Sequence, residues 1–215
     1  MAGWSVEAQS CGHRYTRNWI FRSLDFTLAP GSKTALLGPN GSGKSTLGRM
    51  LAGHILPAEG RMVWANEIRS FHSEDAGNDV LRSTMLAGTG AALPFHLSAR
   101  EAIDWQATFR SVRPRTELEA ALRSAGLSAA LDAELRTLST GMRARVHLTV
   151  ALGTTAGILV LDEPTANLDH AGKAWYRELL GDWGRETTVV VCTNTPAEDC
   201  PDFAAWIDLA GGKSM

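Results

Sequence analysis

The segment 38–45, with the sequence GPNGSGKS, constrains the fold of this chain more than any other segment. It fits the pattern G-x-x-x-x-G-K-[ST] at every fixed position. It lies between an apolar run at 34–37 and a helical-looking stretch that follows at once. Glycines let backbone N–H groups curve around phosphate oxygens without a Cβ in the way, and the positive end of the next helix favours the same anion. The pattern predicts a buried strand, a phosphate-binding loop and a helix in succession.

Single residues of this loop have expected roles. The Lys44 ammonium is expected to reach the β- and γ-phosphates of a nucleotide, and the Ser45 hydroxyl is expected to ligate Mg²⁺. The loop residues that we predict to hold the nucleotide are Gly38, Asn40, Gly41, Ser42, Gly43, Lys44, Ser45 and Thr46. The alternative, a glycine-rich turn that carries a solvated lysine, leaves the complete pattern and its context unexplained.

A second polar group ends another apolar run. Residues 158–163 read ILVLDE, so two carboxylates follow four aliphatic side chains. Ligand sites of open α/β sheets lie at the carboxyl ends of the strands. We expect Asp162 to hold Mg²⁺ through its coordinated waters and Glu163 to polarise the attacking water as a general base. The alternative is a strand that ends in two solvated acids without a function. The presence of the phosphate loop in the same chain favours the magnesium and general-base interpretation over this alternative.

The remaining pattern predicts an α/β fold with a mainly parallel sheet. Apolar runs at 34–37, 158–161 and 188–192 alternate with helical stretches, as in a parallel sheet that is covered on both faces. The first 30 residues indicate short strands of an N-terminal antiparallel β-subdomain, and residues 70–78 indicate a surface loop. Residues 91–138 are rich in Ala, Leu, Glu and Arg and indicate an inserted helical lobe. We predict one domain, with the core at about 1–88 and 143–215 and the lobe at about 89–142.

Composition narrows the classes of function. The net charge is -2, and no dense block of Lys and Arg indicates a nucleic-acid partner. Three cysteines at irregular spacing form neither a disulfide framework nor a zinc signature, which fits a reducing, cytosolic compartment. The longest aliphatic run, 158–161, is far too short to span a bilayer. Any action on a membrane is therefore expected to pass through a partner.

Residues 138–142, LSTGM, end 20 residues before Asp162 and separate this chain from other phosphate-loop proteins. The segment resembles the LSGGQ signature of ABC ATPases, the ATP-binding subunits of ABC transporters. The resemblance implies a head-to-tail dimer in which Ser139 and Gly141 of one subunit face the γ-phosphate held by the other, aided by the positive end of a helix. Ser139 is also a plausible N-cap of that helix, and both roles are compatible.

Two further elements resemble the same family. The segment 166–169, ANLD, resembles the D-loop that contacts the facing subunit, which places Asp169 near the nucleotide, although Asp169 also fits an N-cap. By resemblance, Tyr15 is the aromatic residue that stacks on adenine, and Trp19 and Phe21 are nearby rivals.

Two positions depart from the family pattern. The family carries a histidine that contacts the γ-phosphate just after its last core strand, and Asn194 stands there in this chain. The family also carries a glutamine at the entry to the helical lobe, and Thr89 stands at the matching position, give or take one residue. We predict Glu163, Lys44 and Asn194 as catalytic residues and Ser45, Asp162 and Thr89 as metal ligands. The changes predict a site that binds MgATP well and hydrolyses it slowly.

The resemblance implies an ATP-binding subunit that uses ATP and Mg²⁺, forms a homodimer or a heterodimer with another ATP-binding subunit, and drives a transmembrane permease from the cytoplasmic face of the membrane. No nucleic-acid partner is expected. The apolar residues Leu93, Pro94, Phe95 and Leu97 indicate either a coupling surface or lobe core. The alternatives are a non-transport ABC ATPase that acts on a nucleic-acid or ribosomal partner and a small-molecule kinase. This sequence has no second cassette and no coiled coils, which disfavours the non-transport ABC ATPase. The LSTGM segment disfavours the small-molecule kinase.

Overall fold

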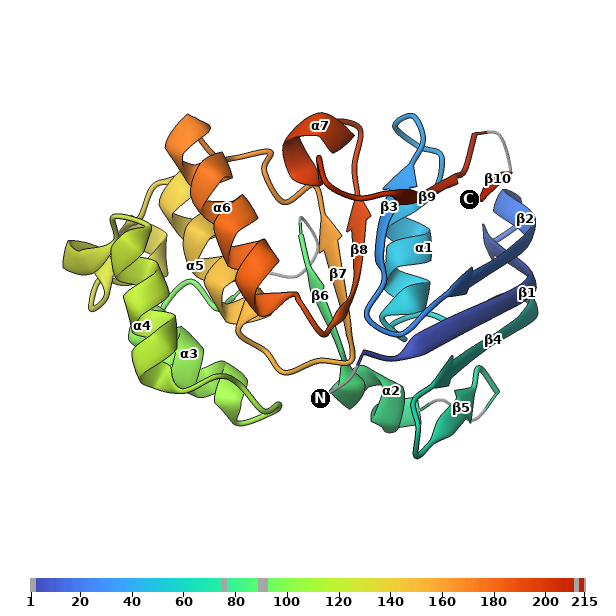
Figure 1. The fold of residues 1–215 in the computed structure, drawn as a ribbon, viewed down its shortest axis with the longest axis horizontal. Coiled ribbons are helices and arrows are strands. Elements are labelled where there is room, and N and C mark those ends of the chain that lie inside the picture. Colours follow the sequence, from blue (N-terminus) through green and yellow to red (C-terminus); the bar gives the residue numbers. More distant parts are fainter. Residues whose placement is uncertain (1–2, 75–76, 89–92, 211–212, 215) are drawn as a thin grey trace.

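A six-stranded sheet forms the centre of the computed structural model, which describes residues 3–74, 77–88, 93–210 and 213–214 (Figure 1). Its strand order is β10-β9-β3-β8-β7-β6, and all pairs are parallel except β9 with β10. The strands are β3 (Lys33–Leu37), β6 (Thr84–Ala87), β7 (Ile158–Asp162), β8 (Thr188–Cys192), β9 (Ala205–Asp208) and β10 (Lys213–Ser214). The predicted mainly parallel sheet is confirmed, while β6, β9 and β10 escaped prediction.

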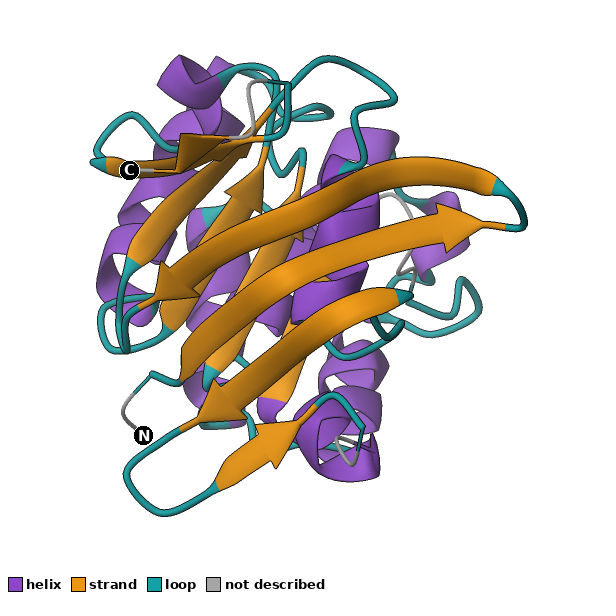
Figure 2. Ribbon diagram, turned by 90° about the vertical axis from the view of Figure 1, so that its right-hand side faces the viewer, coloured by secondary structure: helices purple, strands orange, loops and turns teal. Residues whose placement is uncertain are grey.

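An antiparallel sheet of order β2-β1-β4-β5 covers one side of the molecule (Figure 2). Its strands are β1 (Ser5–Tyr15), β2 (Asn18–Leu28), β4 (Glu59–Ala65) and β5 (Ser70–His72). The predicted N-terminal antiparallel β-subdomain is confirmed. The expectation of short strands is wrong, because β1 and β2 each span 11 residues.

Seven helices are described in the part of the chain given above. They are α1 (Lys44–Leu51), α2 (Gly77–Ser83), α3 (Ala99–Ala107), α4 (Arg115–Ser124), α5 (Thr140–Leu152), α6 (His170–Trp183) and α7 (Pro196–Asp199). The expected surface loop at 70–78 is wrong in part, because β5 and the start of α2 lie there. Among the described residues, no helix combines the length and the apolar character needed to cross a membrane.

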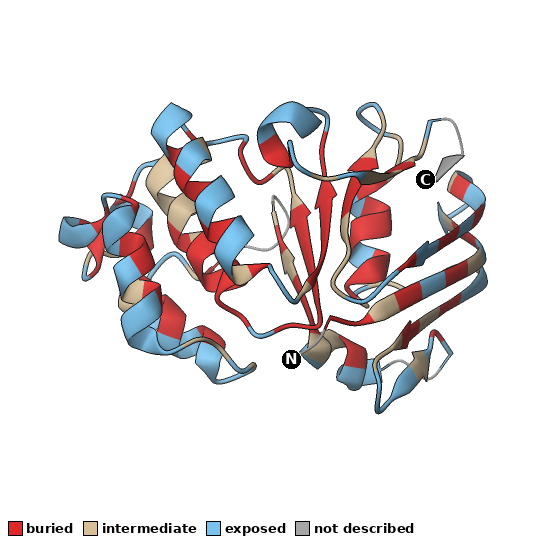
Figure 3. Ribbon diagram, viewed as in Figure 1, coloured by how far each residue is buried: buried red, intermediate tan, exposed pale blue. Residues whose placement is uncertain are grey.

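Successive side chains of a strand point to opposite faces of the sheet, so the large sheet has one hydrophobic core on each face. Ile158 and Val160 of β7 belong to a core shared with α1 and the antiparallel sheet. Leu159 and Leu161 belong to a core shared with α5, α6 and the helices before them. Figure 3 shows the buried residues along the central strands between these layers. Each buried aliphatic side chain contributes about 1.5–3 kcal/mol, so strand register is strongly fixed.

The helical region between β6 and α5 contains α3, α4 and two 3₁₀ turns at Ser128–Ala130 and Leu135–Thr137. Ser98 and Glu101 form a capping box that starts α3. The expected boundary of the lobe at residue 142 falls inside the continuous helix α5. The division into core and lobe stays a prediction.

Candidate nucleotide-binding site

The phosphate loop leaves β3 at Leu37 and enters α1 at Lys44, as the sequence predicts. Gly41 and Gly43 have φ angles of 83° and 101°, which L side chains rarely adopt. A Cβ on Gly43 would lie 2.5 Å from Cγ2 of Ile20 and 2.9 Å from Cδ1 of Phe21. The hairpin of β1 and β2 therefore packs directly against the loop, and only glycine fits at this position.

Lys44 is buried, with 6% of its surface exposed, and its ammonium group turns back over the loop. Nζ donates hydrogen bonds to the carbonyl oxygens of Gly38 at 2.7 Å and Pro39 at 3.1 Å. A third bond runs to Oδ1 of Asn194 at 2.7 Å. This geometry directs the cation to the space where a phosphate on the loop would lie.

Asn194 joins the residues that we predicted to be catalytic. Besides accepting from Lys44, its amide donates to Oδ1 of Asn40 and, at 3.3 Å, to Oε1 of Glu163. Asn194 also lines an open cleft with Gly38, Pro39 and Asn40. The structure thus brings Lys44, Asn194 and Glu163 into one network, although their catalytic roles stay predictions.

Glu163 follows the last residue of β7 and adopts a φ of 50°, the left-handed region. Its backbone N–H donates to the carbonyl oxygen of Cys192 at 2.9 Å, which extends the pairing with β8 by one bond. A non-glycine residue in a sparsely populated conformation costs about 1–3 kcal/mol, and such residues cluster at functional sites. The strained turn places the carboxylate beside Asn194 rather than in the sheet.

Ser45 and Asp162, two of the predicted metal ligands, line one small cavity of about 10 Å³ together with Gly88. A Cβ on Gly88 would lie 2.5 Å from Cβ of Asp162, so a glycine is required beside the carboxylate. A hydroxyl and a carboxylate are hard oxygen donors, and Mg²⁺ is usually held by few protein ligands plus phosphates and water. The residues present therefore fit Mg²⁺. Thr89, the third predicted ligand, lies outside the described residues.

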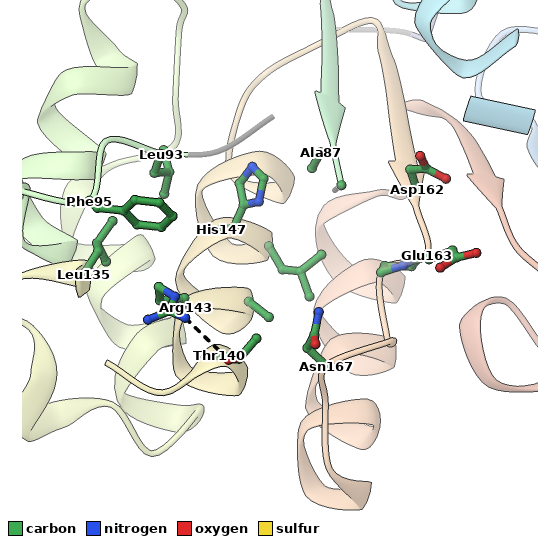
Figure 4. Close-up of a pocket in the computed structure, with 14 residues that line it drawn as sticks. Ala87, Leu93, Phe95, Leu135, Thr140, Arg143, His147, Asp162, Glu163 and Asn167 are labelled. Atoms are coloured by element: carbon green, nitrogen blue, oxygen red, sulfur yellow. Dashed lines mark hydrogen bonds between the residues drawn. The ribbon is translucent and has the colours of Figure 1, made fainter. Parts of the chain in front are cut away.

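A cavity of about 170 Å³ separates the end of β7 from α5. Figure 4 shows Asp162 and Glu163 on one side and His147, Arg143 and Thr140 along α5 on the other. Burial lowers the pKa of His147, which favours the neutral imidazole. Sequence reasoning gave His147 no role, because nothing in its spacing places it in a cavity with two acids.

The signature segment opens α5. Ser139 is the N-cap residue, since its hydroxyl accepts a hydrogen bond from Met142 N at 3.2 Å, and it is exposed. The N-cap interpretation is thereby confirmed. A Cβ on Gly141 would lie 3.0 Å from the carbonyl oxygen of Asn167, so this glycine lets the segment 166–169 pass close by. The role of Ser139 and Gly141 toward a second subunit's nucleotide stays a prediction.

Asp169 is the N-cap of α6, accepting from Gly172 N at 2.8 Å, and it pairs with Arg145 of α5. The hydrogen bond from Gly172 and the charge of Arg145 lower the pKa of its carboxyl group. Arg145 also donates to the carbonyl oxygen of Ala125 at 2.7 Å. The N-cap interpretation is confirmed, and a contact of Asp169 with nucleotide stays a prediction.

Two of the three aromatic candidates for adenine stacking are available. Tyr15 is 44% exposed and Trp19 is 36% exposed, whereas Phe21 is buried against the phosphate loop. The guanidinium of Arg22 lies 4.2 Å from the centroid of the Trp19 ring and covers one face of this ring. Tyr15 stays our prediction, and burial removes Phe21.

The apolar residues before α3 have two different environments. Leu93 is buried in the core shared with α5, so the lobe-core interpretation holds for it. Phe95 is 56% exposed, and the Arg143 guanidinium lies 5.7 Å from the centroid of its ring. Phe95 therefore exposes apolar surface in this segment, and its role in coupling to a partner stays a prediction.

Known proteins share both the sequence pattern and the fold. The family model described as ABC transporter matches residues 21–166. The chain belongs to the ABC transporter family. It is 34% identical, over 98% of its length and 97% of the relative, to the cytochrome c biogenesis ATP-binding export protein CcmA 2 of Cupriavidus metallidurans. A protein of the same type from Rhodopseudomonas palustris is 33% identical over 82% of this chain and 85% of the relative.

The solved structure of a putative ABC transporter ATP-binding protein from Pyrococcus furiosus has a TM-score of 0.79 at 22% identity and covers 98% of this chain and 100% of that chain. This likeness confirms the fold that the resemblance implied. The chain is thus an ATP-binding subunit of an ABC transporter, with ATP hydrolysis coupled to transport. The match to a family model described as ABC transporter, together with a match to an export protein over nearly the whole chain, supports the transport interpretation over a ribosomal or nucleic-acid one.

Proposed function

We propose that this ABC subunit binds MgATP between two ATP-binding subunits, a homodimer or a heterodimer, with Mg²⁺ held by Ser45 and Asp162. The exposed N-cap at Ser139 supports this arrangement, because the first N–H groups of a helix and its positive end favour an anion brought by another subunit. Bound Mg²⁺ would neutralise charge on the phosphate oxygens. Glu163 would accept the proton of the attacking water.

We infer that hydrolysis is slow, and the contacts of Asn194 carry this inference. Asn194 links Lys44 at 2.7 Å with Glu163 at 3.3 Å, so it occupies the sensor position between the phosphate-binding cation and the general base. A neutral amide can donate a hydrogen bond to a γ-phosphate oxygen, but it cannot become a cation as an imidazole can. Less of the negative charge that develops in the transition state is therefore stabilised.

We propose that the chain powers export through a transmembrane partner at the cytoplasmic face of the membrane. Both CcmA relatives described above are named export proteins of cytochrome c biogenesis, which supports export as the direction. The partner would contact Phe95, the exposed aromatic residue beside the cavity. Phe95→Asp should abolish co-purification with the transmembrane partner when the two are co-expressed, whereas Phe109→Asp, at the similarly exposed Phe109, should not.

The hydrolysis proposal is tested by single-turnover ATP hydrolysis at high protein concentration. Asn194→His is expected to raise the rate constant about 10-fold, because an imidazolium stabilises the developing charge. Glu163→Gln is expected to lower it by about 10²-fold or more, the scale of general-base catalysis. A wild-type rate constant that Asn194→His leaves unchanged would show that Asn194 is an adequate sensor and that hydrolysis is not slowed there.

A further inference from the structure

A buried carboxylate lies behind Asn194, outside the residues assigned so far. Asp199 is the last residue of α7, and only 2% of its surface is exposed. Among the described residues, no Lys or Arg forms an ion pair with it. Its carboxylate is held instead by the hydroxyls of Thr193 and Thr195 and by the backbone N–H of Thr165. Burial of a carboxylate removes its hydration, so these hydrogen bonds must replace water.

The hydrogen-bond directions at Asp199 are fixed by a second contact. The Thr193 hydroxyl accepts from the backbone N–H of Thr195 at 2.8 Å, so its own proton is directed to Oδ2 of Asp199. The Thr195 hydroxyl donates to the same oxygen at 3.3 Å. Asp199 therefore holds the residue before Asn194 and the residue after it, and this leaves the Asn194 side chain to face the site.

The other oxygen of Asp199 reaches a different loop. Oδ1 accepts the backbone N–H of Thr165 at 3.1 Å, two residues beyond Glu163. The same loop continues to Asn167, whose carbonyl oxygen lies against Gly141 of the signature segment. One carboxylate thus connects the loop that carries Asn194 with the loop that leads from the general base to the signature segment.

Two cationic side chains of α6 hold α7 in place. Arg177 donates to the carbonyl oxygens of Ala197 at 3.2 Å and Glu198 at 3.0 Å, and Lys173 pairs with the Glu198 carboxylate. These contacts fix the short helix from outside the site. Asp199 is consequently held by α6 through α7, in addition to the bond from its backbone N–H to the carbonyl oxygen of Thr195 at 3.1 Å.

Asp199 and its neighbour Cys200 are buried, although both also line a pocket of about 210 Å³. Burial and the neighbouring Asp199 charge raise the pKa of the Cys200 thiol to about 12, and the same two causes raise that of the Tyr176 hydroxyl. Hydrogen bonds of buried groups are stronger than those in water, and a buried polar group that loses its partner is costly. The connection between the two loops therefore depends on the Asp199 carboxylate itself.

We propose that Asp199 is a positioning residue that fixes the Asn194 loop to the loop after Glu163, so that binding of the γ-phosphate at Asn194 is transmitted to residues 165–169. This rests on the proposed function, because it takes Asn194 as the γ-phosphate sensor. The 3.3 Å contact between the Asn194 amide and the Glu163 carboxylate is the distance that Asp199 would maintain.

The kinetic test compares Asp199→Asn with Asp202→Asn, the same change at an exposed aspartate three residues further on. Asp199→Asn is expected to lower the single-turnover rate constant about 10-fold, since misplacement by 1 Å costs up to about 10²-fold, while the Kd for ATP changes less than about twofold. Asp202→Asn should change neither quantity. Thr193→Val, which removes one donor with little change in volume, should act in the same direction with a smaller effect.

A double-mutant cycle separates positioning from a general loss of stability. In an Asn194→Ala background, Asp199→Asn should slow hydrolysis less than about twofold, because the residue that it positions is gone. An equal 10-fold loss in both backgrounds would overturn the proposal. If Asn194→Ala and Asn194→His leave the rate unchanged, the sensor role itself fails. If they change it and both Asp199→Asn and Thr193→Val do not, only the Asp199 proposal fails.

Amide hydrogen exchange gives a readout that does not need catalysis. With a non-hydrolysable ATP analogue and Mg²⁺, the native chain should gain protection in residues 193–199 and in residues 165–169. Asp199→Asn at saturating analogue should keep the first protection and lose the second. Protection of both segments in Asp199→Asn would refute transmission through this carboxylate.

Discussion

Replacing Gly43 by Ala tests how tightly the phosphate loop is packed. At a φ of 101° an L residue is destabilised by about 1–2 kcal/mol. The new Cβ would lie 2.5 Å from Ile20 and 2.9 Å from Phe21, and overpacking of this kind costs about 1–3 kcal/mol. The free energy of unfolding should therefore fall by about 2–5 kcal/mol, a large part of the about 5–15 kcal/mol typical of a domain.

Urea unfolding followed by tryptophan fluorescence measures this loss, and Gly181→Ala in α6 is the matched control. Gly181 is exposed, and a Cβ there would meet no atom within 4 Å. Alanine is favoured over glycine in a helix by about 1 kcal/mol, so this control should be neutral or stabilising. The same substitution is thus expected to have opposite signs at the two positions.

A second substitution separates the strain of the backbone from the clash. Ile20→Ala removes the nearest side-chain atom, so the double mutant with Gly43→Ala should be more stable than additivity predicts by about 1–3 kcal/mol. The remaining loss reports the φ angle together with the contact to Phe21 at 2.9 Å, which Ile20→Ala does not remove. A Gly43→Ala loss below about 1 kcal/mol, or strict additivity with Ile20→Ala, would refute the packing of the hairpin on the loop.

Three further predictions concern stability and pH. Hydrogen bonds and charges of Arg100, Arg115 and Arg123 lower the pKa of Glu119 to about 2. The stabilisation by the Glu119 carboxylate is therefore present above the unfolded-state pKa of about 4.5 and is lost as pH falls toward 2. Glu119→Gln should lower Tm at pH 7 but should hardly change it near pH 2. Burial lowers the pKa of His147, so the unfolded chain binds a proton at this residue more readily than the folded one, and the free energy of unfolding should decline as pH falls below about 6.5. His147→Gln should flatten this dependence of the free energy of unfolding on pH, measured by urea unfolding across pH 5–8. Trp64→Phe removes the bond from Nε1 to the Leu51 carbonyl oxygen and leaves a void in the core, so it should cost about 2–4 kcal/mol, measured by urea unfolding.

Within the large sheet, the strands that the sequence predicted are those whose burial is nearly uniform. β7 and β8 are buried along almost their whole length, so they appear as uninterrupted apolar runs. β1 is harder to read because its register shifts after Ala8, where Ser10 adopts a φ of 48°. Such bulges interrupt the alternation of apolar and polar residues, so the sequence pattern of one long strand looks like that of several short strands.

The missed elements gain their stability from distant partners. β6 has only four residues, and its pairing with β7 joins Thr84 with Ile158. β9 depends likewise on β3, through the pair of Ala205 and Thr34. Short segments without a local periodic pattern carry too little information for prediction, since cross-strand neighbours decide their state.

The candidate site shows the same division between motif and tertiary contact. The order of motifs placed Lys44 and Asn194 at strand ends, but their bond joins residues 150 positions apart. That bond exists because β3 and β8 are adjacent, with Leu36 opposite Cys192, so the loops after both strands emerge together. Sheet order therefore decides which strand-end residues meet. Asp199 escaped prediction for the further reason that its partners, Thr165 and Thr193, converge only after α7 has turned the chain back. A residue that acts by holding two loops has no local signature, and only its buried hydrogen bonds reveal it.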